Sequence, residues 1–217
     1  HGTDHRILFD ALKSAGPAYR GVAIVNDSVS DEELARLHEA GVRGARFNFW
    51  KQLNITPSAD EFRRSIRRIS QFGWLVKIHN SGDAWLELED LLLETRLPVI
   101  IDHLGHVDLS KGIDQPVYKM FWRLFERSNF WMMASNSDRY SMQERGWGDA
   151  IAFVRAVLER IPDRTIWCTD WPHVQYRKPM PTDTELIELL CQATPALALR
   201  RKVLAENPAH LFGFNAS

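Results

Sequence analysis

Short apolar segments alternate with amphipathic segments along this chain, and the alternation constrains the fold more than any single residue does. The first, Gly21–Val25, has the continuous hydrophobicity of a strand buried on both faces of a parallel sheet, and the others are strand-like. Each is followed by a segment with helical periodicity. Successive apolar segments end 21, 33, 24, 32 and 35 residues apart, near Val25, Arg46, His79, His103, Ser135 and Asp170.

Six such units predict an α/β fold, and their spacing is about that of a (β/α)8 barrel. A doubly wound open sheet would have similar spacing, but its glycine-rich phosphate loops, GxGxxG or GxxxxGK[ST], do not occur in the sequence. The pattern therefore favours a barrel of the TIM type. Because no low-complexity segment or linker interrupts the repeat, we expect residues 1–217 to form a single catalytic domain.

Composition excludes several classes of partner. Lys plus Arg (27) nearly balances Asp plus Glu (28), so bulk charge predicts neither nucleic-acid nor membrane-surface binding. Two cysteines, Cys168 and Cys191, give no disulfide framework, which fits a reducing, cytoplasmic setting. We expect the partner to be a small-molecule substrate, recognised by local charges, and a homo-oligomer is compatible with the sequence.

Three chemically active side chains stand at the ends of separate predicted strands. His79, His103 and Asp170 form a nitrogen and oxygen set typical of zinc or manganese sites, and they also suffice for acid/base catalysis. A lone histidine at a strand end is more often a hydrogen-bonded core residue. Three such residues at equivalent ends favour a catalytic or metal site at the C-terminal mouth of the sheet.

Four further residues are candidates for substrate binding. Arg46 and Arg139 can clamp a carboxylate, because a guanidinium presents paired donors that match its two oxygens. The alternative for both is a solvated loop charge. His106 and His173 follow His103 and Asp170 closely in sequence and are predicted to contact the substrate.

Four motifs resemble the amidohydrolase-related family, and most of all its 2-pyrone-4,6-dicarboxylate lactonases and sugar-lactone hydrolases. In chain order they are GARFNF (44–49), IDHLGH (101–106), CTDWPH (168–173) and NPAHLFG (207–213). The resemblance implies a distorted (β/α)8 barrel that hydrolyses lactones or amides. By the same resemblance, Asp170 takes a proton from the attacking water and passes it to the leaving oxygen.

The resemblance also bears on metal binding. The histidines matching His79 and His103 bind a metal in metal-dependent members, and Asp170 would complete the set. In the pyrone lactonases a tyrosine replaces the first histidine, and hydrolysis proceeds without metal. Because His79 is a histidine here, we expect a bound divalent metal (zinc or manganese), and a metal-free mechanism stays open.

Two departures from the family pattern affect the expected substrate and how much of the barrel the chain is expected to contain. The pyrone lactonases carry a further arginine at the position of Gln52, so one carboxylate or a polyhydroxylated lactone is as well supported as a dicarboxylate. The family's first strand, which ends in an HxH pair, and its second strand have no counterpart here, so we expect a C-terminal three-quarters of a barrel. A decarboxylase or hydratase on the same scaffold, or an inactive fragment, remain the alternatives.

Overall fold

The strands form one parallel sheet with the order β1-β2-β3-β4-β5-β6. The structure is a computed structural model that describes residues 2–51 and 56–214. The strand order confirms the six predicted strand and helix units. The strands are β1 (Gly21–Ile24), β2 (Val42–Asn48), β3 (Leu75–His79), β4 (Val99–Ile101), β5 (Phe130–Ala134) and β6 (Thr165–Trp167).

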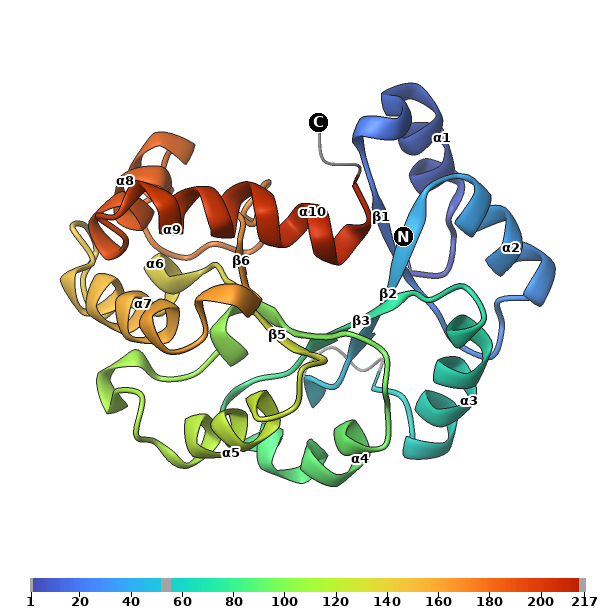
Figure 1. Cartoon of the computed structure of the whole chain (residues 1–217), viewed down its shortest axis with the longest axis horizontal. Helices are drawn as coiled ribbons and strands as arrows, with labels where there is room; N and C mark the ends of the chain where they lie inside the picture. Colours follow the sequence, from blue (N-terminus) through green and yellow to red (C-terminus); the bar gives the residue numbers. More distant parts are fainter. Residues whose placement is uncertain (1, 52–55, 215–217) are drawn as a thin grey trace.

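Helices connect the strands and pack on the outer face of the curved sheet, as in a TIM barrel (Figure 1). None of the helices in residues 2–51 and 56–214 has the length and apolar character needed to span a membrane. The helices are α1 (Arg6–Ala15), α2 (Asp31–Glu39), α3 (Ala59–Ser70), α4 (Glu89–Leu93), α5 (Pro116–Phe125), α6 (Ser137–Tyr140), α7 (Gly148–Arg160), α8 (Asp183–Ala193), α9 (Leu197–Arg201) and α10 (Asn207–Phe212).

Side-chain caps fix where three of these helices begin. The Ser30 hydroxyl accepts a hydrogen bond from the Glu33 amide at the start of α2. Ser58 and Thr182 each form a reciprocal capping box at the start of α3 and α8. Each cap satisfies amide groups that the first helical turn leaves unpaired.

The two faces of the sheet pack against different elements. Outward-facing strand residues join the main core beneath the helices, and α10 covers part of the inner face. Leu211 and Phe212 of α10 pack on a second cluster, which consists of Leu75, Ile100, Trp131, Met133 and Ile166. Figure 1 shows α10 lying across the molecule between β6 and β1. A contact of 3.2 Å from Arg20 Nη2 to the Gly213 carbonyl joins the end of α10 to the loop before β1.

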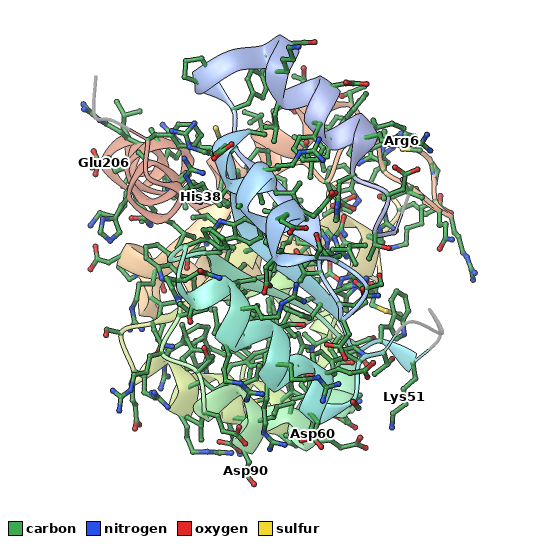
Figure 2. The ribbon with its side chains drawn as sticks, turned by 90° about the vertical axis from the view of Figure 1, so that its right-hand side faces the viewer. Arg6, His38, Lys51, Asp60, Asp90 and Glu206 are labelled. Carbon is green, nitrogen blue, oxygen red and sulfur yellow. The ribbon has the colours of Figure 1, made fainter. Side chains whose placement is uncertain are left out.

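The strands end in a common direction. In Figure 2, Lys51, which follows β2, lies at one end of the molecule, and Glu206 lies at the opposite end.

β4 and β6 stop earlier than their sequence pattern predicts. His103 lies in a tight turn (Asp102–Gly105) with φ 50°, and Asp170 lies beyond β6 with φ 63°. Such left-handed backbone cannot continue a strand, so both side chains project from turns.

Candidate active site

The register of β2 and β3 brings four polar side chains together on the inner face. Arg46 pairs with Lys77, and Asn48 pairs with His79. Asn48 Oδ1 lies 3.0 Å from Arg46 Nε and 3.1 Å from His79 Nδ1. Arg46 and Lys77 are like charges directly opposite each other, an arrangement that destabilises a sheet unless a counter-charge is near.

Asp102 supplies that counter-charge. Its side chain is fully buried, and Lys77 Nζ lies 3.2 Å from Oδ1 while Arg46 Nη1 lies 3.5 Å from Oδ2. His103 Nε2 also lies 3.3 Å from Oδ1. Asp102 therefore joins groups from β2, β3 and the turn after β4. Burial alone would raise the pKa of Asp102, but the charges of Lys77, His103 and Arg46 outweigh burial and lower it.

His103 links this buried carboxylate to Asp170. Its Nε2 lies 3.4 Å from Asp170 Oδ1, and its Nδ1 lies 2.7 Å from Ser135 Oγ. Because carboxylate oxygens face Nε2 on both sides, we assign the ring hydrogen to Nε2, so that Nδ1 accepts from the Ser135 hydroxyl. The second oxygen of Asp170 lies 3.4 Å from Arg139 Nη2. The Asp170 side chain is 27% exposed, so water can reach it.

Three imidazoles lie close together, and one of them, His103, contacts Asp170. The ring centroids of His79 and His103 are 6.0 Å apart, and His106 lies 4.6 Å from His79 and 4.9 Å from His103. Tyr140 hydroxyl bonds His106 Nδ1, and Trp50 packs against His79 and His106. Burial lowers the pKa of His79 to about 3, with a further contribution from Arg46. Burial also lowers the pKa of His106 to about 2, so these rings are neutral near pH 7.

Arg139 is held in place by the loop that follows Asp170. Its Nη1 donates to the Val174 carbonyl at 3.0 Å, and its guanidinium lies 5.1 Å from the Tyr176 ring centroid. The Tyr176 hydroxyl donates to Asp138 Oδ2 at 2.7 Å. The guanidinium therefore faces Asp170 in a fixed orientation.

His173 is the predicted site residue that the structure places elsewhere. Its backbone amide donates to the Asp170 carbonyl at 2.8 Å, but its buried imidazole lies 3.7 Å from Asp183 Oδ1 and 6.3 Å from the Tyr176 ring. No contact among the described residues joins it to the histidine cluster. Its left-handed backbone, φ 57°, turns the side chain toward the start of α8. Gln52, the position of the family's additional arginine, lies outside the described residues.

The sequence contained signals for two site residues that we did not predict. Lys77 precedes His79 by two residues, so strand alternation places both on the inner face. Asp102 follows the inward-facing Ile100 by two residues in the same way. Tyr140 had no comparable signal, because its contact depends on how neighbouring elements pack.

The described residues do not by themselves fit a metal ion. Among residues 2–51 and 56–214, no group of three or more His, Cys, Asp or Glu side chains is close enough to hold one. The Asp102 carboxylate faces the cations Lys77 and Arg46 instead of an open cavity. The divalent metal expected from the sequence stays a prediction.

Comparison with known proteins identifies the family of this site. The sequence matches the amidohydrolase family over residues 1–214. The chain belongs to the amidohydrolase family. It is 38% identical to a 2-pyrone-4,6-dicarboxylate hydrolase of Comamonas testosteroni, over 98% of this chain and 72% of the relative. It is 34% identical to a 4-sulfomuconolactone hydrolase of Rhizobium radiobacter, again over 98% and 72%.

Solved structures of amidohydrolases confirm the fold. A protein of Acinetobacter baumannii described as a probable 2-pyrone-4,6-dicarboxylic acid hydrolase, with citric acid bound, superposes with a TM-score of 0.85 at 27% identity. The match covers 98% of this chain and 80% of the other. The chain is thus a hydrolase with an amidohydrolase barrel sheet.

Proposed function

We propose that this amidohydrolase opens a lactone that carries an anionic group. The observation that carries the proposal is the contact between His103 and Asp170, each from a different strand end, with Arg139 on the second Asp170 oxygen. A base held between a neutral imidazole and a guanidinium, and open to water, suits hydrolysis of a cyclic ester. The names of the two relatives, both lactone hydrolases, support this choice of substrate class.

In the proposed reaction, Asp170 acts as the general base. It takes a proton from water, whose oxygen attacks the lactone carbonyl. The ring C–O bond then breaks, and Asp170 returns the proton to the leaving oxygen, so that the product is a hydroxy acid. His103 holds Asp170 through Nε2, and Ser135 fixes the ring on the other side.

Two guanidiniums face the space where the substrate would bind. Arg46 is 28% exposed and Arg139 is 21% exposed, so each retains donors that a ligand can reach. A carboxylate or sulfonate on the lactone would accept these donors, and a charge-assisted contact of this kind contributes about 1.5 to 3 kcal/mol. Binding through these groups would present the ring carbonyl to the water beside Asp170.

Product analysis tests the proposal. The complete protein is incubated with carboxylated lactones, and ring opening is followed by mass spectrometry together with proton release. We expect a mass gain of one water, about 18 Da, and one proton released per turnover, because the hydroxy acid ionises near pH 7. Release of carbon dioxide without ring opening would instead show a decarboxylase, the alternative that the scaffold permits.

A further inference from the structure

One ring nitrogen of His103 lies between two carboxylates. Its Nε2 is 3.3 Å from Asp102 Oδ1 and 3.4 Å from Asp170 Oδ1. Both distances exceed that of a well-formed N–H···O bond, so the ring is committed to neither oxygen. A full hydrogen bond from Nε2 can be made to one carboxylate at a time. The negative charge that each carboxylate presents to the ring therefore decides which one accepts the hydrogen.

Burial by itself favours Asp102 as the acceptor. Asp102 is fully buried, whereas the Asp170 side chain is 27% exposed and can also bond water. Neither Asp102 oxygen accepts a hydrogen bond from the part of the chain that the structure describes. A buried carboxylate without compensation would therefore take the Nε2 hydrogen. Asp170 would then lose the imidazole contact that orients it.

Lys77 opposes this effect. Its Nζ lies 3.2 Å from Asp102 Oδ1, which is the same oxygen that faces His103 Nε2. Arg46 lies at the other oxygen, Oδ2, at 3.5 Å. Of these two cations, Lys77 is thus the one that weakens the oxygen competing for the hydrogen. Because the Lys77 side chain is only 15% exposed, water and salt screen its charge little.

The position of Lys77 in the sheet indicates that its charge matters. Lys77 lies in the middle of β3 and shares the inner face with Leu75 and His79. A cation there is costly, because it is largely buried and lies directly opposite Arg46 on β2. Methionine would fill a similar space at lower cost if packing were the only requirement. Asp102 is the acid that the ammonium group contacts among residues 2–51 and 56–214.

We propose that Lys77 is a positioning residue of this site: by compensating Asp102 Oδ1, it leaves the His103 Nε2 hydrogen to Asp170. This inference rests on the proposed role of Asp170 as the general base. Lys77 acts through Asp102 and His103 and needs no contact with the lactone. Without its charge, Asp102 draws the imidazole away from Asp170, and Arg139 is left to orient the base.

Variants at two positions separate charge from packing. Lys77→Gln removes the charge and keeps a hydrogen-bonding group, while Lys77→Arg keeps the charge. Lys77→Gln combined with Asp102→Asn removes both members of the ion pair. The single Gln variant leaves a buried carboxylate with one remaining cation and is the one most at risk of misfolding. The double variant buries no unpaired carboxylate and should fold.

The nitrogen-15 resonance of His103 Nε2 gives a readout that does not depend on catalysis. It is measured on the complete protein through the carbon-bound ring hydrogens, which do not exchange with water, and is identified by its loss in His103→Asn. In the parent, Asp170→Asn should shift this resonance more than Asp102→Asn does, because Asp170 accepts the hydrogen. In the Lys77→Gln background the order should reverse. Lys77→Arg should keep the parent order.

Kinetics on a carboxylated lactone connects the hydrogen bond to turnover. In Lys77→Gln, kcat should fall at least about ten-fold with a smaller change in KM, and Lys77→Arg should recover most of the loss. The double variant should also recover kcat, because the competing carboxylate is gone. A lysine that only supports the fold would lower Tm and leave kcat of the folded protein unchanged. Lys119→Met, which removes an exposed lysine on α5, is the matched control and should alter neither kcat nor Tm.

The outcomes separate the two proposals. If the parent opens no lactone but the order of the resonance shifts reverses in Lys77→Gln, the proposed function is overturned and the positioning role stands. If Asp102→Asn gives the larger shift in the parent, or folded Lys77→Gln keeps the parent kcat, the positioning role is overturned. Where Lys77→Gln does not fold, the shifts in the parent and kcat of the double variant decide. A double variant that folds but stays at least about ten-fold slow would also overturn the positioning role.

Discussion

At the scale of single residues, the site depends on two side chains held by left-handed backbone. His103 has φ 50° and Asp170 has φ 63°, a conformation that non-glycine residues rarely adopt. Such geometry costs on the order of 1 to 3 kcal/mol per residue and persists only where surrounding contacts enforce it. Here the contacts to Asp102, Ser135 and Arg139 do so.

The first prediction concerns Asp170. Asp170→Asn keeps the shape of the side chain but removes the base, so kcat should fall by roughly 100-fold or more. KM should change little, because Arg46 and Arg139 are expected to hold the substrate. Steady-state kinetics on the complete protein measures both constants. A variant with near-native kcat would show that Asp170 only shapes its turn.

The second prediction concerns Arg46. Arg46→Met removes hydrogen-bond donors from the space where the substrate would bind. Lys77 still balances the negative charge of Asp102, so the fold should be retained. KM for a carboxylated lactone should rise roughly 10-fold to 100-fold with a smaller change in kcat. Arg123→Met, which breaks an exposed pair with Glu89, is the control and should leave KM unchanged. An unchanged KM in Arg46→Met would remove this arginine from the substrate site.

Sequence alone placed some of these residues better than others. Arg46, His79 and His103 follow from strand order, because parallel strands end at one edge of a sheet. His173 was expected beside them from its place in the motif with Asp170, but the positive φ of the intervening turn directs it to α8. Turn dihedrals of this kind are set by tertiary packing, which local sequence does not reveal.

At the scale of elements, the turn after β4 depends on close packing against α5. Gly105 has φ 75°, and a Cβ atom there would lie 2.6 Å from Phe121 Cε2. Phe121 is fully buried, so the ring has little room to move. The turn that positions His103 is therefore coupled to the packing of the helix behind it.

The third prediction follows from this packing. Gly105→Ala should destabilise the protein by roughly 2 to 5 kcal/mol, the combined cost of left-handed alanine and overpacking. Gly112→Ala is a matched control, since Gly112 also has a positive φ (66°) but no atom within 4 Å of the added Cβ. The free energy of unfolding of Gly112→Ala should fall only by the cost of a left-handed alanine backbone, about 1 to 2 kcal/mol. Urea unfolding of both variants measures the difference, and equal losses would contradict the packing argument.

Element order and type were predictable from the sequence, while element ends were less so. The strand-like segments predicted all six strands, although β2 and β3 carry the charged residues Arg46 and Lys77 within them. The ends of β4 and β6 were placed too late, since no glycine or proline separates Ile101 from His103 or Trp167 from Asp170 to mark the turn.

At the scale of the whole molecule, buried neutral histidines make stability depend on pH. The pKa is about 3 for His79 and about 2 for His106 in the folded protein, against about 6.5 for an unfolded histidine. The unfolded chain therefore binds more protons than the folded protein as pH falls below about 6.5. Stability is fully present above that pH and is lost progressively between about pH 6.5 and 3.

The fourth prediction measures this loss. The free energy of unfolding should fall with decreasing pH below about 6.5, and each histidine should contribute up to about 1.4 kcal/mol per pH unit. His106→Gln should remove one such contribution and flatten the slope. Urea titrations at several pH values provide the data. A slope that is the same in parent and variant would show that His106 is charged in the folded state.

The buried carboxylate at position 102 has a consequence for how mutations combine. It touches both Arg46, which we assign to binding, and His103, which orients the base. Loss of either neighbour changes the field acting on the other, so a double-mutant cycle between Arg46 and His103 should show non-additive effects. Removing Asp102 should abolish that non-additivity. Substrate recognition and proton transfer in this enzyme would then be thermodynamically coupled through a group that touches neither the substrate nor the water.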